Sequence, residues 1–336
     1  MKNRKRNIFI ILIISLVVLY FVFKDDPVEK IKCLFSLNPI WLLVSFSLMF
    51  VYWILKGIVL YYITRKIDKT FTIKDGIKLM ISTQLFHSIT PFASGGQPWQ
   101  IYKLKKRGVP VGESTNMVIE DFIAYQIALI LLGVLAVLLN HFLNIIPNTS
   151  HLRYLVLIGF SMNMLVIILL FIVAFSKKWN KKIIDFTIKV LYKIKIIKDK
   201  KKMLKKSEKF INNFHGGAEI LFSDKMNFIR IILLNFAALT FQYLVPFTLM
   251  LGLGVFVNPI YVVTCSAYVM LIDSMIPTPG STGGLEYGFM SFFKTFIKGS
   301  KLSAVMIVWR VITYYFGIIM GFIFINVKDK EVGTWG

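Results

Sequence analysis

The chain has 336 residues, of which 56% are hydrophobic, and its mean hydropathy is +0.68. A soluble domain cannot bury so much apolar surface, so the composition excludes that class and indicates a polytopic α-helical membrane protein. The formal net charge of +23 indicates basic cytoplasmic loops in contact with anionic lipid. The alternative, a nucleic-acid partner, is disfavoured because the sequence shows no RNA- or DNA-binding module.

Residues 8–23 form the first apolar run, behind a basic N-terminus. A bilayer core needs about 20 residues, so this run is short for a span. No small-residue cleavage site follows, and we interpret the run as a first span with its N-terminus inside rather than as a signal peptide. Residues 39–63 predict a second span that returns inward, and the basic residues after it agree with the positive-inside rule.

The next unit is interrupted at its middle. Residues 72–89 begin polar, turn apolar and stop at the motif Thr-Pro-Phe-Ala-Ser-Gly-Gly, residues 90–96. Residues 97–104 follow and lead into a basic cluster. Because both ends of the unit are basic, we expect a re-entrant hairpin that opens toward the cytoplasm.

Two further spans and a long polar segment complete the first half. Residues 116–139 predict a span toward the outside, and residues 152–175 predict the return. Residues 176–227 are polar and rich in lysine, with apolar residues at helical spacing in the first part. This segment is interpreted either as a basic amphipathic helix on the inner leaflet or as a solvated connector.

The second half repeats this order. Residues 228–255 predict a span from inside to outside, interrupted by Pro246. Two apolar segments, 260–276 and 285–297, then flank a second motif, Thr-Pro-Gly-Ser-Thr-Gly-Gly. Residues 302–327 predict the last span, and a cytoplasmic C-terminus requires the second hairpin to open outward.

The two motifs share the pattern T-P-x-x-[S/T]-G-G, and neither can continue a helix, because proline lacks an N–H and glycine leaves the backbone free. Broken helices at corresponding places in two halves are typical of transporter binding sites in inverted repeats. We therefore predict an all-α polytopic membrane protein with about six full spans and two re-entrant hairpins. The single transmembrane domain, 1–336, would consist of repeat halves 40–175 and 228–327 around the connector 176–227. If both hairpins crossed fully, there would be about ten crossings, for which several segments are too short.

Backbone N–H groups and hydroxyls beside helix ends attract anions, and a lipid phosphodiester is the anion available at that depth. The alternative is a tight turn whose glycines allow close packing. We expect the two motifs to meet in a polar pocket between the leaflets. The candidate substrate-binding residues are Thr90, Ser94, Gly95 and Gly96 in the first motif, Thr278, Ser281, Thr282, Gly283 and Gly284 in the second, and Glu286 and Arg310 after it.

Arg310 lies inside the last predicted span, where a guanidinium is costly unless it faces a cavity or a carboxylate. Asp273 and Glu286 flank the second motif and are the expected partners. A paired arginine can also bind a phosphate through two nitrogens, and the alternative is a purely structural ion pair.

The first half contains a similar set of charges. Glu120 and Asp121 lie near the inner end of one span and are candidate partners for Lys56 in another. His87 precedes the first motif, and it is either a proton-linked group or a histidine whose bonds are satisfied in the core.

Signatures of catalysis are missing from the sequence: there is no P-loop, G-x-S-x-G elbow, H-E-x-x-H or cysteine–histidine cluster. We therefore predict no catalytic residue, no metal and no cofactor.

Several strings resemble one family. They are the paired motifs, the Glu120–Asp121 pair that opens a span, the P-x-P-G-x-x-G-G-x-E string at 277–286 and the W-R-x-x-T-Y-Y string at 309–315. Together they resemble the transmembrane domain of bacterial lysylphosphatidylglycerol synthase/flippase proteins over roughly residues 8–327. In two-part members this domain flips aminoacylated phosphatidylglycerol, which a separate C-terminal domain makes from lysyl-tRNA.

The resemblance implies handling of anionic or lysylated lipid and, by extension, resistance to cationic antimicrobial peptides. The sequence departs from the family pattern in two ways. It ends at Gly336, so we expect the transferase domain to be absent, and Asp121 stands where a basic residue is expected.

The main hypothesis is a lipid translocase in the bacterial plasma membrane, with both termini cytoplasmic. Its partners would be an anionic phospholipid and a separate lipid-modifying enzyme. Two alternatives remain at this point: a phosphatidylglycerol lysyltransferase or a component of that pathway, and a non-transporting scaffold that recruits a partner through its basic segment.

Overall fold

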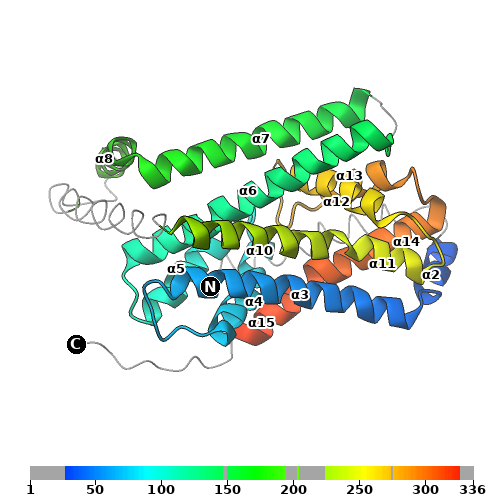
Figure 1. The fold of residues 1–336 in the computed structure, drawn as a ribbon, viewed down its shortest axis with the longest axis horizontal. Coiled ribbons are helices and arrows are strands. Elements are labelled where there is room, and N and C mark those ends of the chain that lie inside the picture. Colours follow the sequence, from blue (N-terminus) through cyan, green and yellow to red (C-terminus); the bar gives the residue numbers. More distant parts are fainter. Residues whose placement is uncertain (1–26, 147–149, 194–202, 204–223, 274, 326–336) are drawn as a thin grey trace.

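The computed structural model describes residues 27–146, 150–193, 203, 224–273 and 275–325 (Figure 1). The predicted first span at 8–23, most of the later part of the predicted connector and both termini lie outside the described residues. In chain order the helices are α2 Pro27–Phe35, α3 Pro39–Thr64, α4 Ile73–Ser88, α5 Gly96–Lys106, α6 Val111–Leu143, α7 Ser150–Phe175, α8 Lys177–Lys193, α10 Lys225–Tyr243, α11 Val245–Gly252, α12 Pro259–Asp273, α13 Gly284–Phe293, α14 Gly299–Arg310, the π-helical turn η1 Val311–Tyr315 and α15 Phe316–Ile325.

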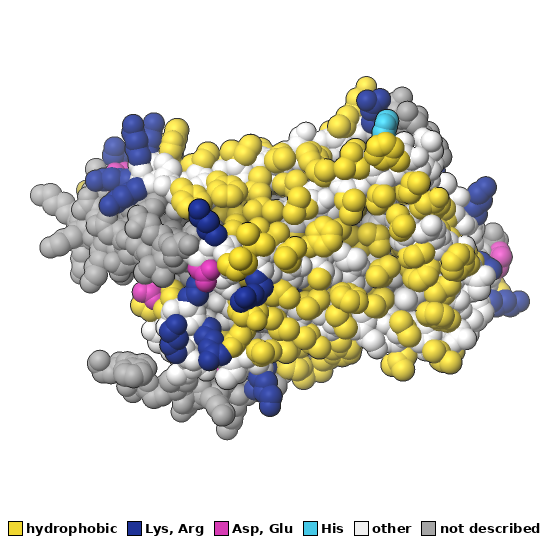
Figure 2. All heavy atoms as spheres, viewed as in Figure 1, with side chains coloured by type: hydrophobic (Ala, Val, Ile, Leu, Met, Phe, Trp, Pro, Cys, Tyr) yellow, Lys and Arg dark blue, Asp and Glu magenta, His cyan; other side chains and the backbone are white. Residues whose placement is uncertain are grey.

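Five helical stretches of the described chain are long and apolar enough to cross a membrane. They are α3, α6, most of α7, α10 with α11, and α14 with η1 and α15. Figure 2 shows a broad band of hydrophobic side chains across the middle of the molecule, with Lys and Arg side chains gathered at its ends. The prediction of an all-helical, multi-pass membrane protein is therefore confirmed.

Several element boundaries differ from the predicted ones. The segment after the first apolar run contains a short helix, α2, and α6 is 33 residues long, extending past the predicted span 116–139 at both ends. The predicted interruption at Pro246 is confirmed, because α10 ends at Tyr243 and α11 begins at Val245. α8 shows that the first part of the basic segment is helical.

α4 and α5 form the first hairpin, and its two free ends lie together. Arg107, just after α5, contacts carboxylates on both sides of the start of α4: Nε lies 3.2 Å from Asp68 Oδ2, and a terminal nitrogen lies 3.3 Å from Asp75 Oδ1. Thr72 caps α4 through a reciprocal pair of bonds with Asp75. These contacts close the base of the first hairpin, and the first motif forms its tip.

α12 and α13 form the second hairpin, with the second motif at its tip. The Tyr261 and Phe296 rings meet at its base, with their centroids 6.0 Å apart. The Asn38 N–H donates to the Gly252 carbonyl at 3.0 Å, so the start of α3 lies beside the end of α11 at this end of the molecule. In Figure 1 the first hairpin lies toward the left of the view and the second toward the right.

The two halves pack on each other in a reciprocal way. α6, which follows the first hairpin, packs on α12 of the second. α15, which ends the helix after the second hairpin, packs on α4 of the first, while α3 and α10 pack directly together. Each hairpin is thus held by the helix that follows the other one.

Candidate functional site

The tips of the two hairpins touch. Pro91 and Pro279 form an antiparallel backbone bridge, which lies outside any named strand. These two prolines occupy the same position of the shared pattern. An antiparallel pairing of equivalent residues is the local geometry that a two-fold relation between the halves produces.

The two tips also share part of their backbone shape. The third and fourth positions of the pattern have positive φ in both loops: 53° at Phe92 and 51° at Ala93, then 61° at Gly280 and 51° at Ser281. Positive φ is uncommon outside glycine, and a bulky residue such as Phe92 adopts it only under constraint from its surroundings. The turn at these two positions is therefore shared, whereas the sixth position differs, with φ −80° at Gly95 and 96° at Gly283.

Hydroxyl groups close the first tip from within. Thr90 donates its Oγ1 hydrogen to the Phe86 carbonyl at 2.6 Å and accepts the Gly95 N–H at 2.8 Å. Ser94 donates to the Pro91 carbonyl at 2.9 Å, and its side chain is exposed. Both hydroxyl hydrogens are therefore engaged in the loop, so in this conformation neither can be donated to an anion.

His87 belongs to the same loop. Its Nδ1 lies 2.5 Å from the Ala93 carbonyl oxygen, and its ring fills the space that a β-carbon on Gly96 would enter. The contacts assign His87 to holding the tip in shape, and they explain why glycine opens α5.

The second tip is more deeply buried and is closed in a similar way. Thr278 donates to the Thr282 carbonyl at 2.9 Å, and Thr282 donates to the Pro279 carbonyl at 2.8 Å. Ser281 donates to the backbone carbonyl of Asp273 at 3.1 Å. The hydroxyl hydrogens of both motifs are thus engaged in stabilising the loops, so an anion would need other hydrogen-bond donors.

Arg310 supplies such donors directly beneath the second tip. Its Nε lies 2.7 Å from Glu286 Oε1, in an ion pair rather than an aligned hydrogen bond, and both side chains are at most 8% exposed. The terminal nitrogen Nη2 donates to the Gly280 carbonyl at 3.0 Å and to Thr282 Oγ1 at 3.3 Å. Glu286 accepts the Gly283 N–H at 2.7 Å, which fixes the carboxylate at the start of α13.

The two expected partners of Arg310 are therefore not equivalent. Glu286 forms the ion pair, whereas no ion pair between Asp273 and Arg310 is found among the described residues. Asp273 is joined to the second tip through its main chain, because its backbone carbonyl accepts the Ser281 hydroxyl hydrogen.

Sequence reasoning missed the contribution of Tyr314. The π-helical turn η1 begins directly after Arg310, and the Tyr314 ring centroid lies 4.5 Å from the guanidinium carbon. The Tyr314 hydroxyl donates to the Ser88 carbonyl at 3.0 Å, at the end of α4. π-helical turns are rare and often occur at functional sites. One side chain thus joins the arginine of the second half to the helix that leads into the first motif.

The charges of the first half form two ion pairs instead of one cluster. Lys56 Nζ lies 2.7 Å from Asp121 Oδ1 and donates to Asn235 Oδ1, also at 2.7 Å. Lys66 Nζ lies 2.9 Å from Glu120 Oε1. Successive residues on an α-helix point about 100° apart, so Glu120 and Asp121 face different partners. Only Asp121 matches the predicted pairing with Lys56.

We expect the Lys56→Met variant to lose about 3–5 kcal/mol of stability, because it leaves a buried carboxylate without its cation. The loss is measured by thermal unfolding of the purified protein in detergent. Lys56→Met/Asp121→Leu removes both charges and is expected to recover most of it. Lys69→Met, at an exposed position in the loop after α3, is the matched control. Equal unfolding of the Lys56 and Lys69 variants would contradict a structural role for the pair.

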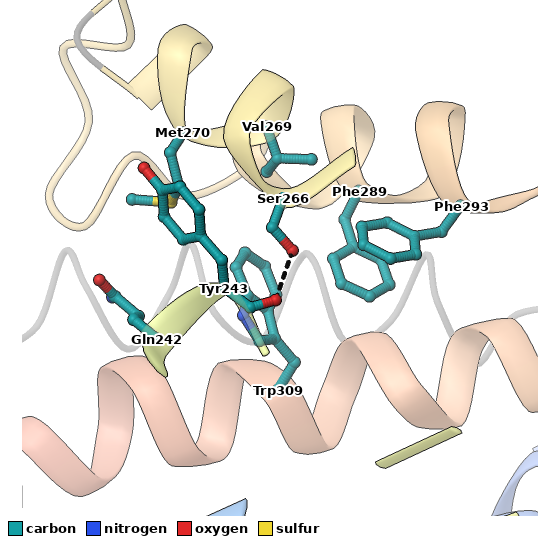
Figure 3. Close-up of a pocket in the computed structure, with 8 residues that line it drawn as sticks. All are labelled: Gln242, Tyr243, Ser266, Val269, Met270, Phe289, Phe293 and Trp309. Atoms are coloured by element: carbon teal, nitrogen blue, oxygen red, sulfur yellow. Dashed lines mark hydrogen bonds between the residues drawn. The ribbon is translucent and has the colours of Figure 1, made fainter. Parts of the chain in front are cut away.

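The interior cavities are small. Figure 3 shows one of about 10 Å³ between α10, α12, α13 and α14, where Ser266 donates to the Tyr243 carbonyl at 3.0 Å and the Trp309 ring forms one wall. A second, of about 20 Å³, lies at the base of the first hairpin. One water molecule needs about 10–15 Å³ by the same measure, so neither cavity holds a lipid headgroup.

The base of the first hairpin also carries a balanced charge. Burial is the largest influence on Asp75 and would raise its pKa, but hydrogen bonds from Thr72 and the charge of Arg107 outweigh it and lower the pKa overall. The ionised carboxylate stabilises the position of Arg107, whose terminal nitrogen lies 3.3 Å away.

Two comparisons with known proteins match almost the whole chain. A family model described as "Lysylphosphatidylglycerol synthase TM region" matches residues 8–321. A protein of Archaeoglobus fulgidus described as "UPF0104 membrane protein" is 23% identical over 329 residues, which cover 96% of this chain and 98% of that protein.

Proposed function

The chain belongs to the lysylphosphatidylglycerol synthase transmembrane-region family, and from this premise we propose that it is a lipid translocase. It would move phospholipid or aminoacylated phosphatidylglycerol between leaflets, with the headgroup passing between the two motif loops. We place it in the plasma membrane, with both termini on the cytoplasmic side. The antiparallel bridge between Pro91 and Pro279 carries this proposal, because it places two broken-helix tips at one point.

We further infer that the two hairpins are re-entrant and that the halves are inverted repeats. Three features support this topology. The hairpin bases lie at opposite ends of the molecule, equivalent residues meet at the tips, and each hairpin packs on the helix that follows the other. An arrangement of this kind lets one site face each leaflet in turn.

Arg310 is the group that we propose contacts the lipid phosphate. In the closed state its Nη2 is bound to Gly280 and Thr282 of the second tip. If the second tip moves away from Arg310 as the two tips part, these donors become available, and a guanidinium can hold a phosphate through two parallel hydrogen bonds.

The contact between the tips supports the view that this conformation is the occluded one, because the two motif loops lie directly against each other. Transport would then require the tips to part. This requirement gives a direct test, since a covalent bond between the tips should stop transport without removing any side chain that contacts lipid.

We expect a Pro91→Cys/Pro279→Cys variant to flip lipid when reduced and to stop when oxidised. Bridged residues have α-carbons about 4.5–5.5 Å apart, within the range of about 4.4–6.8 Å that a disulfide spans. The background replaces both native cysteines, Cys33 and Cys265, by alanine. Flipping is measured in vesicles as loss of accessible fluorescent phosphatidylglycerol on the outer leaflet.

The two single-cysteine variants are the controls, and their flipping should not respond to oxidant. Unchanged flipping in the oxidised double variant, with the disulfide verified by mass, would refute transport through the tips. Incubation of the protein with lysyl-tRNA and phosphatidylglycerol separates the lysyltransferase alternative, for which product formation is the supporting result.

We also propose that α8 lies on the inner leaflet. Trp179 and Phe186 are 52% and 68% exposed there, among lysines along the same helix. A basic helix with exposed aromatic side chains fits an anionic membrane surface. The same surface could receive a separate lipid-modifying enzyme.

A further inference from the structure

Two arginines lie at the seam where α3 of the first half packs on α10 of the second. Arg65 follows the last turn of α3, and Arg230 lies in the second turn of α10. The two helices pack directly together, and the hydrogen bond from Lys56 Nζ to Asn235 Oδ1 joins them. In Figure 1, α3 ends and α10 begins toward the left of the view, so both arginines lie at that end of the molecule.

Each arginine lies over a tyrosine of α3, and the two tyrosines are neighbours. The guanidinium carbon of Arg65 is 5.3 Å from the Tyr61 ring centroid, and a terminal nitrogen donates to the Tyr61 hydroxyl. The guanidinium carbon of Arg230 is 5.0 Å from the Tyr62 ring centroid. The two rings meet edge to face, with their centroids 5.3 Å apart. These four side chains form one continuous arginine–tyrosine cluster, to which both halves of the chain contribute.

The positive charge of this cluster is not balanced within the described part of the chain. No ion pair joins Arg65 or Arg230 to a carboxylate there. Asp68 and Asp224 are the acidic residues closest to them in the sequence, and both are engaged elsewhere. Asp68 pairs with Arg107, and Asp224 caps the start of α10. Stacking on tyrosine restrains a guanidinium but leaves N–H donors for another acceptor.

Exposed apolar side chains adjoin the cluster on α10. Ile229 and Leu233 are both more than half exposed and lie one turn apart. Arg230 is three residues from Leu233, so the two side chains are neighbours on the helix surface. Figure 2 shows Lys and Arg side chains gathered at this end of the hydrophobic band. The surface thus offers cations at the level of lipid headgroups and an apolar stripe at the level of acyl chains.

A phospholipid with a net negative charge matches both parts of this surface. A guanidinium binds phosphate through charge-assisted, paired hydrogen bonds, and the acyl chains would cover the apolar stripe of α10. Both arginines are exposed, so the headgroup needs no cavity. A free phosphate would use the arginines alone, and a zwitterionic lipid would bring its own cation to a cationic surface.

We propose that Arg65 and Arg230 jointly bind the phosphate of an anionic phospholipid, and that this lipid ties the two halves together at the seam. The lipid lies in the leaflet at this end, which the proposed topology makes the inner one. It is a bound lipid and not the transported one, so the inference goes beyond the proposed function. Because one phosphate accepts hydrogen bonds from an arginine of each half, its binding favours the packing of α3 on α10.

The binding test uses purified protein in detergent, titrated with short-chain phosphatidylglycerol, with bound lipid counted by native mass spectrometry. Arg65→Gln/Arg230→Gln is expected to bind about tenfold more weakly, because both guanidinium contacts with the phosphate are lost. Lys69→Gln/Lys225→Gln is the matched control, since it removes the same charge from exposed positions at the same end. Arg65→Lys/Arg230→Lys keeps the charge but loses the planar fork, so its affinity should fall between those of the wild type and the Gln pair.

Thermal unfolding reports whether the lipid ties the halves together. A ligand that binds only the folded protein stabilises it, so phosphatidylglycerol should raise the unfolding temperature of the wild type more than phosphatidylcholine does. The Gln pair should lose this increase. Without lipid it should unfold close to the wild-type temperature, because both arginines are exposed.

Four results would overturn the inference. They are unchanged lipid affinity in the Gln pair, an equal loss in the control pair, equal binding of phosphatidylcholine by the wild type, and competition by glycerol 3-phosphate as strong as by the lipid. The second would mean that net charge alone decides binding, and the fourth would assign the arginines to a soluble phosphate. Weaker binding in the Gln pair but not in the control pair, together with the lost stabilisation, supports the seam lipid.

The seam lipid and the translocase fail in different ways. Arg310→Met removes the group proposed to contact the transported phosphate, so binding that persists in this variant and is lost on adding the Gln pair belongs to the seam. If the wild type flips no lipid while this pattern holds, the seam lipid stands and the translocase falls. If flipping by the wild type is normal and Arg310→Met abolishes all binding, only the seam lipid falls.

Discussion

Vesicles that contain the Arg310→Met variant are expected to show no protein-dependent lipid flipping. The substitution removes the guanidinium that lies against the second tip. Among the described residues there, it is the only group that can offer two parallel donors to a phosphate. Methionine has a similar length and leaves the nearby stack of Phe289 on Trp309 largely intact. Flipping is measured with fluorescent phosphatidylglycerol in reconstituted vesicles.

The stability of the same pair separates its structural role from transport. Glu286→Leu leaves Arg310 charged and buried, which is expected to cost about 3–5 kcal/mol. Arg310→Met/Glu286→Leu removes both charges, so its unfolding temperature should return close to that of the wild type, with flipping still absent. Arg153→Met, at an exposed position of α7, is the control for both measurements. Wild-type flipping by the double variant would show that the ion pair is structural only.

The architecture of the chain could be predicted from its sequence because the signals are physical and local. A long apolar run with basic ends is expected to form a membrane-spanning helix, because every backbone polar group must be satisfied within the segment. A proline followed by paired glycines interrupts such a helix. The ends of α6 were harder to predict, because its first turn is polar and lies before the predicted span. A polar turn is no obstacle to a helix once Pro110 has set its start, and Asn144 ends it in a left-handed conformation.

The details of the site depend on long-range contacts that no local pattern encodes. The sequence placed Glu120 and Asp121 near Lys56, but it could not say which of two adjacent side chains would point at it. The π-helical turn after Arg310 was also not predicted. The turn accompanies a hydrogen bond from the Tyr314 hydroxyl to the Ser88 carbonyl, two residues that are far apart in the sequence.

Gly280→Ala is expected to be among the most damaging small substitutions in the chain. Gly280 has φ 61°, and a β-carbon there would overlap the Tyr314 ring. The alanine must therefore displace a ring that lies over Arg310 and whose hydroxyl binds Ser88. We expect a loss of about 2–4 kcal/mol, of which about 1–2 kcal/mol is backbone strain and the rest overpacking. Thermal unfolding and the flipping rate report the two consequences.

Gly299 offers a control with the same backbone strain and no clash. Its φ is 60°, and a β-carbon there meets nothing within 4 Å. The difference between Gly280→Ala and Gly299→Ala therefore isolates the contact with Tyr314. The double variant Gly280→Ala/Tyr314→Ala should lose less stability than the two single variants lose together, because the alanine at 280 occupies space that the ring has left. Equal unfolding temperatures and equal flipping rates in the two glycine variants would contradict this prediction. The second tip would then not depend on Tyr314, and the contact of this ring with both halves would not be needed for function.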